Sequence, residues 1–151
     1  MASTLDATDR RIVDALAKDG RMSIRTLAQS LHISRANAYA RVERLLSSGV
    51  IRGFRAEVDP TAVGLATSAF ITINLRQADW REVNARLHAV PGIAHIALVG
   101  GDFDVIVLVR ARDNADLRRI VLDEIHSIPG VLSTRTLLVF EESDPPQPWP
   151  M

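Results

Sequence analysis

Residues 23–46 have the sequence SIRTLAQSLHISRANAYARVERLL, which predicts two short helices joined by a tight turn. Ser23 is a favourable N-cap, and the apolar residues that follow it recur at the i, i+3, i+4 and i+7 spacing of one helix face: Ile24, Leu27, Ala28 and Leu31. His32 and Ile33 form the turn, and Ser34 caps the second helix. The apolar stripe of that helix continues to Gly49 and consists of Ala38, Val42, Leu45 and Leu46.

A further helix is expected before these two. Asp6, followed three residues later by Asp9, is typical of a helix N-terminus, and the buried stripe after it would be Ile12, Val13 and Leu16. Three short helices are the smallest arrangement that lets one of them project from a core and enter the major groove of DNA. The first part of the chain therefore predicts a helix–turn–helix domain.

The polar face of the second helix carries the candidate DNA-contacting residues. Opposite its apolar stripe lie Ala36, Asn37, Ala40 and Arg44, with Arg35 and Arg41 on the flanks. Arginine can hold guanine, and asparagine can hold adenine, through paired hydrogen bonds. Positions near the helix N-terminus are the best placed for bases, so Arg35 and Asn37 rank first, while Arg41 and Arg44 contact bases or only phosphates. The expected set on this helix is Ser34, Arg35, Asn37, Arg41 and Arg44.

Residues 51–59 alternate enough to predict a strand after the recognition helix, as in a winged module. Arg52 and Arg55 on this strand would contact phosphate and fix the register without selecting sequence. The charge distribution agrees with a nucleic-acid partner. Residues 1–59 contain ten Lys and Arg against seven Asp and Glu, whereas residues 60–151 contain eight against eleven. A helix–turn–helix that serves only packing, with a merely solvated charged face, is the alternative that the pattern leaves open.

The remainder of the chain predicts a second domain. Strands are expected over residues 70–75, 93–99, 105–109 and 131–140, and helices over residues 80–90 and 117–128. This β-α-β-β-α-β order is that of a ferredoxin-like fold with both helices on one face of the sheet, so the overall class is α+β. The expected domains are residues 1–59 and 68–141, with a linker over 60–67 and a disordered, proline-rich tail over 142–151.

An internal repeat supports this order, because LHAVPGI at 87–93 matches IHSIPGV at 125–131. Each copy marks a helix end, a Pro-Gly turn and the start of a strand, which explains His88 and His126 as helix C-terminal residues rather than metal ligands. The chain has no cysteine. Neither disulfides nor thiolate metal sites are therefore possible. We expect no metal site and no cofactor. No apolar stretch reaches membrane-spanning length and no targeting segment is apparent, so a cytoplasmic protein without a membrane partner is expected.

The strand at 105–109, VIVLV, is apolar on both faces, although helices would cover only one. The same surface of a second subunit is the simplest cover, which predicts an isologous homodimer. Two recognition helices related by a two-fold axis would match a palindromic operator in double-stranded DNA.

Over residues 5–141 the chain resembles the Lrp/AsnC, or feast/famine, transcription regulators. The resemblance rests on three groups of residues: Leu5-Asp6 with Asp9 and Asp19-Gly20-Arg21, Arg41-Val42-Glu43-Arg44-Leu45 with Gly49-Val50-Ile51, and Gly101-Asp102-Phe103-Asp104. It implies a RAM-type C-terminal domain that dimerises and in many members assembles into octamers. It also implies that an amino acid or related metabolite binds near the Gly-Asp-aromatic-Asp turn at a subunit interface.

The turn suits such an effector physically. Gly100 and Gly101 leave backbone N–H groups open to a carboxylate, and Asp102 or Asp104 can pair with an ammonium group. An ordinary hairpin turn is the alternative explanation. Many family members have Thr or Ser where this chain has Gly100, so a hydroxyl contact to the ligand is missing here. The expected effector residues are Gly100, Gly101, Asp102, Phe103 and Asp104, joined through the resemblance by Thr134 and Thr136 from a partner subunit.

The sequence thus predicts a DNA-binding transcription regulator, modulated by an amino acid, with no catalytic residues. Two alternatives remain. Siroheme decarboxylases resemble this family in both domains and would use basic residues and histidines to hold a tetrapyrrole. Here no histidine lies within residues 51–59 or among the arginines of the recognition helix. A metabolite-binding assembly module with an inactive helix–turn–helix is the other, and a DNA mobility shift would separate it from a regulator.

Overall fold

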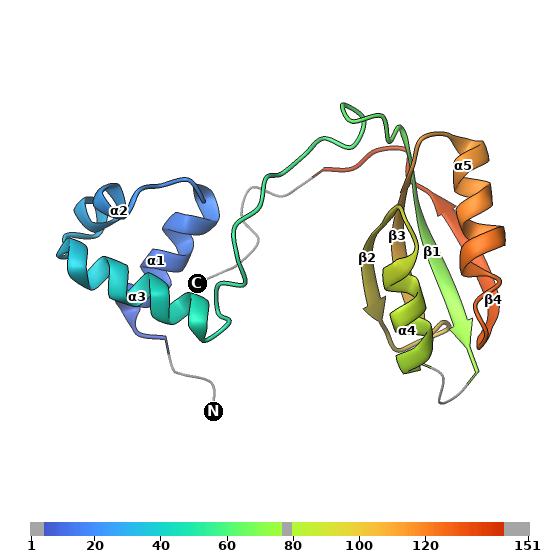
Figure 1. Ribbon diagram of the computed structural model, residues 1–151, viewed down its shortest axis with the longest axis horizontal. Coiled ribbons are helices and arrows are strands. Elements are labelled where there is room, and N and C mark those ends of the chain that lie inside the picture. The colour runs from blue at the N-terminus through green and yellow to red at the C-terminus, as the bar shows by residue number, and fades with distance from the viewer. Residues whose placement is uncertain (1–4, 77–79, 144–151) are drawn as a thin grey trace. The chain divides into compact units, whose positions relative to one another are not determined.

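The computed structural model describes residues 5–76 and 80–143, and the chain divides into two compact units (Figure 1). The described parts of these units are residues 5–57 and, after them, residues 58–76 with 80–143. In the first unit, three helices confirm the expectation: α1 (Ala7–Lys18), α2 (Ile24–Leu31) and α3 (Arg35–Ser47).

Side-chain caps begin all three helices of the first unit. Asp6, Ser23 and Ser34 accept the backbone N–H of the residue three positions on, at 2.8, 3.0 and 3.1 Å. At α1 the cap is reciprocal, because Asp9 also accepts the N–H of Asp6 at 3.2 Å. The apolar stripes meet in one small core, whose buried members are Ile12, Leu16, Leu27, Leu31, Val42 and Leu45. The local signals in the sequence are therefore those that set these helix boundaries.

The prediction of a strand over residues 51–59 is wrong. These residues have no strand conformation, and no segment among the described residues pairs with them. A strand persists only where a neighbour takes up its backbone N–H and C=O groups, and alternation alone supplies no neighbour. Ile51 instead caps the C-terminal end of α3, since its N–H donates to the Leu45 carbonyl at 2.9 Å and its side chain packs on the helical core.

The second unit contains the expected β-α-β-β-α-β order. Its elements are β1 (Thr67–Leu75), α4 (Trp80–Ala89), β2 (Ile93–Leu98), β3 (Val105–Ala111), α5 (Asn114–Arg119) continuing into the π-helical segment η1 (Ile120–Ile125), and β4 (Val131–Leu138). The strands form one sheet in the order β2-β3-β1-β4, with antiparallel neighbours. This is the split βαβ arrangement of a ferredoxin-like fold.

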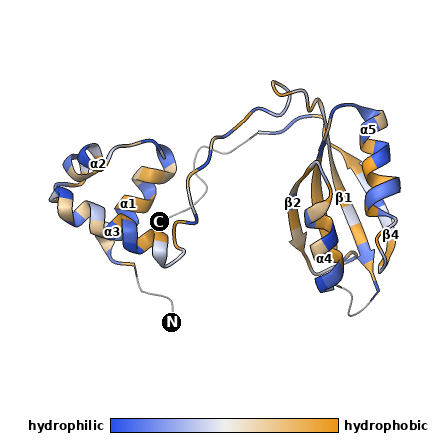
Figure 2. Ribbon diagram, in the orientation of Figure 1, coloured by the Kyte–Doolittle hydropathy of each residue, from blue (hydrophilic) through white to orange (hydrophobic). Residues whose placement is uncertain are grey.

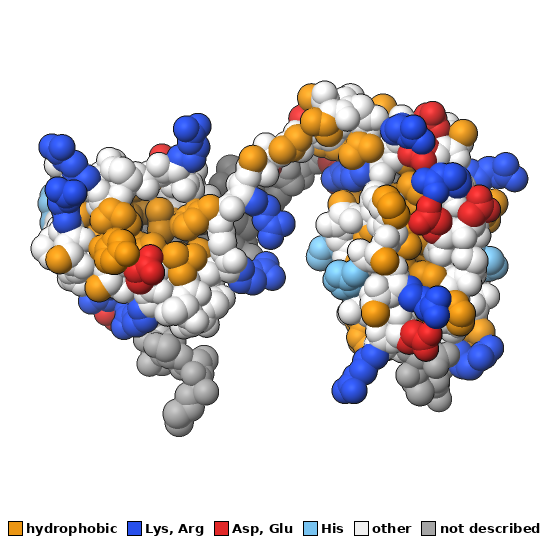
Figure 3. Space-filling model, viewed as in Figure 1, with side chains coloured by type: hydrophobic (Ala, Val, Ile, Leu, Met, Phe, Trp, Pro, Cys, Tyr) orange, Lys and Arg blue, Asp and Glu red, His pale blue; other side chains and the backbone are white. Residues whose placement is uncertain are grey.

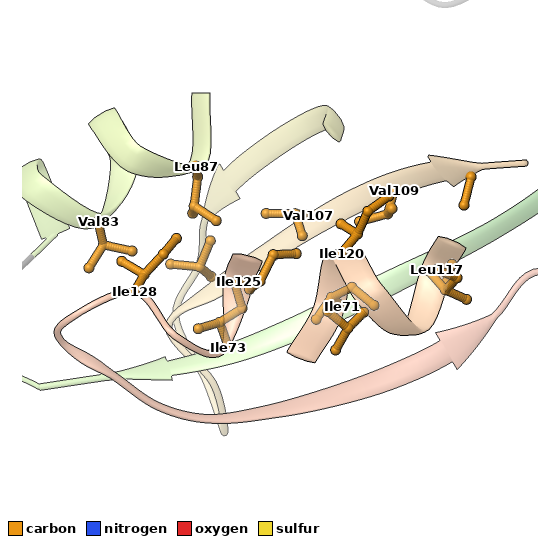
Figure 4. Packing of buried hydrophobic residues seen from close by; sticks show 14 residues of the cluster. Ile71, Ile73, Val83, Leu87, Val107, Val109, Leu117, Ile120, Ile125 and Ile128 are labelled. Carbon is orange, nitrogen blue, oxygen red and sulfur yellow. The ribbon is translucent and has the colours of Figure 1, made fainter. Parts of the chain in front are cut away.

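Both helices cover one face of this sheet, as expected. Alternate residues of β1 and β3 point toward the helices and are fully buried, among them Ile71, Ile73, Val107 and Val109. They pack against Val83 and Leu87 of α4 and against Leu117, Ile120 and Ile125 of α5 and η1 (Figure 4). Hydrophobic colour accordingly runs along the strands, while α5 carries hydrophilic residues outward (Figure 2).

The helix expected over 117–128 differs in detail, because it starts at Asn114 and widens into η1. There the N–H of His126 donates to the Val121 carbonyl five residues back, at 2.8 Å. The extra residue in this turn rotates Leu122 to the surface, where it is 47% exposed, and keeps Val121 and Ile125 buried. Leu122, an apolar residue of the expected helix, therefore lies outside its buried stripe.

The repeated Pro-Gly turns have the role that the repeat predicted. Gly92 and Gly130 both follow a helix and have positive φ angles of 91° and 96°. A Cβ atom on Gly92 would lie 2.6 Å from the Arg110 carbonyl oxygen, so only glycine fits there.

The sheet face opposite the helices carries the other residues of β1 and β3. Phe70 pairs with Leu108, and Thr72 pairs with Ile106, so these side chains share that face. Beyond β4, the carboxylate of Glu142 accepts a hydrogen bond from Nη2 of Arg110 at 3.0 Å. Glu142 is thus held, although the sequence analysis placed it in the disordered tail, and the rest of that tail from residue 144 lies outside the described residues. In the described part of the chain, no helix combines the length and apolar character needed to cross a membrane.

Candidate nucleic-acid interface and ligand-binding turn

The turn between α2 and α3 depends on His32. Its φ of 56° makes it the one residue other than glycine with a left-handed backbone among residues 5–76 and 80–143. The N–H of the next residue, Ile33, donates to the Ala28 carbonyl at 3.0 Å, which closes α2. Ser34 then starts α3 at once, so a turn of three residues joins the two helices, the length typical of a helix–turn–helix.

The outer face of α3 carries polar side chains with small side chains between them. Arg35, Ala36, Asn37 and Ala40 are all exposed, as predicted. The two alanines let the helix backbone approach a groove closely, and an alanine methyl suits contact with the thymine methyl group. Lys and Arg side chains surround an apolar area on the visible face of this unit (Figure 3). Arg35 thus brings a positive charge to this face, and the small side chains leave the helix backbone accessible to a groove.

Arg41 and Arg44 are arranged differently from the open face that the sequence predicted. Nη1 of Arg41 donates to Asp6 Oδ2 at 2.7 Å and to Asp9 Oδ1 at 2.8 Å. Nη2 of Arg44 donates to both carboxylate oxygens of Asp9, at 2.6 and 2.7 Å. The Asp9 side chain is only 3% exposed, whereas that of Arg44 is 53% exposed. The two arginines therefore join α3 to the N-terminus of α1 as well as facing outward.

This network balances the charge of the two arginines. The guanidinium of Arg41 and the N–H of Asp9 hold the pKa of Asp6 below its ordinary value of 3.8. Asp6 and then Asp9 raise the pKa of Arg41 in turn. The charges of Arg41 and Arg44 are thus offset by those of Asp6 and Asp9 at the N-terminus of α1. These two arginines therefore add less to the positive potential of the surface than a count of arginines implies.

Sequence reasoning missed two features of this face. Tyr39 is 58% exposed on α3, one turn after Arg35, and brings a hydroxyl able to donate and accept. The acidic partners of Arg41 and Arg44 were also missed, since Asp6 and Asp9 were interpreted only as a helix cap. Their i, i+3 spacing already placed two carboxylates together, but nothing local indicates a partner more than 30 residues away.

Arg52 and Arg55 lie in the irregular segment after α3 and are exposed. They line an open groove of about 450 Å³ together with Val13 and Leu16 of α1 and Phe54. No strand holds these two arginines in fixed register, which suits contacts with phosphate better than contacts with bases.

The turn between β2 and β3 is held at its end. Asp104 accepts the N–H of Leu75 at 2.7 Å through Oδ2, and its own N–H donates to the Ile73 carbonyl at 3.0 Å. The N–H of Val99 donates to the Asp104 carbonyl at 2.8 Å. Asp104 thereby fixes the turn to the end of β1, so of the two candidate aspartates Asp102 is the one whose carboxylate faces solvent.

Within the described residues, the backbone N–H groups of Gly100, Gly101, Asp102 and Phe103 donate to no protein acceptor. Gly101 has a φ of 139°, and a Cβ atom on either glycine would meet nothing within 4 Å. The turn therefore presents successive open donors beside one exposed carboxylate. This is the arrangement expected of a site for the carboxylate and ammonium groups of one small molecule.

Thr134 and Thr136 lie on one face of β4, as predicted. They pair with Ile73 and Ile71 of β1, which places both on the helix-covered face. Thr136 lines a pocket with Leu117, Val121 and Leu122, and none of the turn residues lines that pocket. Within one chain these threonines do not join the turn, and their expected part in a partner's site stays a prediction.

A capped helix–turn–helix with an exposed polar recognition face, joined to a ferredoxin-like domain with an open-donor turn, defines a DNA-binding regulator with a ligand-binding domain. Comparison with known proteins agrees. Residues 5–52 match the winged helix-turn-helix DNA-binding family, and residues 68–148 match the Lrp/AsnC ligand binding domain. The chain belongs to the Lrp/AsnC family of transcriptional regulators.

Similar proteins span nearly the whole chain. The chain is 36% identical over 141 residues to the HTH-type transcriptional regulator FL11 of Pyrococcus abyssi, covering 93% of each protein. It is 37% identical over 143 residues to the regulator AldR of Mycolicibacterium smegmatis, covering 93% of this chain and 84% of AldR.

Solved structures give the same result. AsnC of Escherichia coli is similar with a TM-score of 0.84 and 28% identity, covering 93% of this chain and 95% of AsnC. A transcriptional regulator from Neisseria meningitidis in complex with L-Met is similar with a TM-score of 0.86 and 28% identity, covering 93% of each chain. These matches confirm the family and the fold that the sequence predicted.

Proposed function

We propose that this regulator binds a palindromic operator as a homodimer and that an amino acid bound at the turn of residues 100–104 changes its affinity for DNA. The observation that carries the proposal is the run of open N–H donors from Gly100 to Phe103 next to the exposed Asp102. An α-amino acid offers a carboxylate to the donors and an ammonium group to the aspartate. The L-Met complex of the Neisseria regulator supports an amino acid as the ligand class.

The proposed DNA-contacting residues are Ser34, Arg35, Asn37, Arg41, Arg44, Arg52 and Arg55, with Tyr39 added from its exposure on α3. Arg35 and Asn37 are assigned to bases, and Arg52 and Arg55 to phosphates. A dimer is supported by the apolar side chains of Phe70, Leu108 and Ile106 on the sheet face without helices, which a second copy would cover.

Thermal denaturation with each of the twenty amino acids tests the ligand, because a molecule bound only by the native state raises the melting temperature. DNA selected by the protein from a random pool is then titrated with and without the amino acid that gives the largest shift. We expect the affinity for DNA to change about 5- to 150-fold, the usual range of allosteric coupling. A melting temperature that none of the twenty raises would overturn the amino-acid assignment.

We further propose regulation, without catalysis, as the role of the chain, because the relatives above are named as transcriptional regulators. Incubation with siroheme, followed by an absorption spectrum of the repurified protein, tests the enzymatic alternative. A colourless protein supports regulation, and release of CO₂ from the carboxylate groups of the added siroheme would refute it.

A further inference from the structure

Asn37 is exposed on the first turn of α3, where a recognition helix contacts base edges. The two ends of its side-chain amide have opposite properties, since Oδ1 only accepts and Nδ2 only donates hydrogen bonds. Pairing with adenine requires both ends, one accepting from N6 and one donating to N7. The base that Asn37 selects therefore depends on which end is already engaged within the protein.

The oxygen of Asn37 is engaged by Arg41. Nε of Arg41 donates to Oδ1 of Asn37 at 3.0 Å. A guanidinium has no acceptor, so the amide atom that faces it is the oxygen, which fixes the orientation of the amide.

Arg41 is itself held in place. Its Nη1 donates to Asp6 and Asp9, and its side chain is only 23% exposed. Asp9 lies almost completely buried at the start of α1 and is also bound by Arg44. The orientation of Asn37 is thus linked through Arg41 to a buried carboxylate on another helix.

Accepting a bond from a cation polarises the amide. The Nδ2 hydrogens become better donors, and Oδ1 becomes a weaker acceptor for a second partner. Each oxygen of Asp6 and of Asp9 also accepts at least one N–H, either from an arginine or from the helix cap. Among the described residues Nδ2 of Asn37 donates to no protein acceptor, so its hydrogens are available to a base.

We propose that Asn37 acts as a hydrogen-bond donor that selects guanine, through its O6 and N7 acceptors, over adenine, and that Arg41 and Asp9 are the positioning residues for this choice. The inference rests on the proposed contact of Asn37 with a base and reverses the adenine preference expected from the sequence. Guanine presents two acceptors where adenine presents one acceptor beside an amino donor.

Selection from a random pool of double-stranded DNA by the full-length protein tests this proposal. The base contacted by Asn37 is the one whose preference disappears in Asn37→Ala. At that position wild type should bind guanine about 10-fold more tightly than adenine, the scale of one good base contact. Asn37→Asp, which offers only acceptors, should instead favour cytosine or adenine there, through their amino groups.

Arg41→Lys keeps the charge that pairs with Asp6 and Asp9 but removes the Nε contact. It should lower the ratio of guanine to adenine affinity severalfold. Arg11→Lys is the control, because Arg11 is exposed on α1, has no hydrogen bond to Asn37 or Asp9 among the described residues and is not one of the proposed DNA contacts, so it should leave that ratio as in wild type. Each ratio compares two DNAs on one protein, so a change in folding stability cancels.

If wild type prefers adenine at this position, or if Arg41→Lys leaves the ratio of guanine to adenine affinity unchanged, the inference is wrong. The proposed DNA-binding function would still stand in that case. If no sequence is enriched, or Asn37→Ala alters no position, the proposed base contact fails and the inference fails with it. The two failures are therefore distinguishable.

Discussion

The carboxylate of Asp104 accepts the backbone N–H of Leu75 at 2.7 Å, and this bond joins the end of β1 to the turn before β3. The two residues are 29 positions apart in the chain. Asp102, two residues earlier, has no comparable contact among the described residues and is exposed. Two aspartates of one motif thus have separate roles, Asp104 in holding the turn and Asp102 in the proposed binding of an ammonium group.

These roles predict opposite consequences of mutation. Asp104→Ala should lower the free energy of unfolding by about 1–3 kcal/mol, because the partly buried N–H of Leu75 loses its acceptor. Asp102→Ala should leave stability and ligand-free DNA affinity nearly unchanged but abolish the response to the amino acid. Urea denaturation and DNA titration with and without ligand measure both. A wild-type ligand response in Asp102→Ala would show that the effector binds elsewhere.

The two glycines of the turn should differ in their tolerance of a side chain. A Cβ atom meets nothing within 4 Å at either position, but only Gly101 has a positive φ, of 139°. Gly101→Ala should therefore cost about 1–3 kcal/mol of stability through backbone strain alone. Gly100→Ala, the matched control, should be close to neutral. Equal melting temperatures for the two variants would contradict the backbone argument.

Acid should destabilise both units. Arg41 lowers the pKa of Asp6, Arg112 and Arg119 lower that of Asp116, and Arg110 lowers that of Glu142. A carboxyl whose folded-state pKa is depressed stabilises the fold above its unfolded pKa. This stabilisation disappears as the pH falls through the folded value, because the unfolded chain binds more protons there. The melting temperature should therefore fall as the pH is lowered below about 4, near the unfolded pKa of Asp.

Asp116→Asn isolates one of these contributions. The amide in this variant cannot be ionised, so the difference between the melting temperatures at pH 7 and pH 3 should be smaller than in wild type. Asp123→Asn is the control, since Asp123 is exposed and forms no ion pair among the described residues. An undiminished difference in Asp116→Asn would rule out its ion pairs with Arg112 and Arg119 as a source of acid sensitivity.

The features predicted correctly are those encoded by neighbours in sequence. Ser23 and Ser34 cap helices where expected, and the Pro-Gly turns at Gly92 and Gly130 begin strands. The continuous apolar run at 105–109 lies in β3, as predicted. Caps, turns and periodic stripes need only a few adjacent residues, so a single sequence contains them.

The features that the sequence did not predict depend on distant partners. The segment at 51–59 alternates like a strand but has no described neighbour to pair with. The contacts of Asp9 with Arg41 and Arg44 span more than 30 residues. The widening of the last helix into η1, which exposes Leu122, reflects how that helix packs on the sheet. Tertiary packing decides each of these.

The irregular conformation of residues 51–59 leads to a prediction about Arg52 and Arg55. No ladder fixes their backbone, so they should contact phosphates without distinguishing sequence. Arg52→Ala and Arg55→Ala should weaken binding to selected and to random DNA by the same factor. Each should also lower the slope of log affinity against log salt by about one unit for every phosphate that the variant no longer neutralises. Titrations of both DNAs at several salt concentrations measure these effects.

Arg35→Ala supplies the contrast, because Arg35 is exposed on the first turn of α3 and makes no ion pair among the described residues. It should weaken binding to selected DNA by about 1–3 kcal/mol and affect random DNA much less. Arg81→Ala, in α4 of the second unit, controls for the loss of one positive charge and should change neither. Arg52→Ala could instead lower the ratio of affinity for selected DNA to affinity for random DNA, as Arg35→Ala should. The segment after α3 would then contact bases, and the proposed division between a base-contacting helix and a phosphate-contacting segment would be wrong.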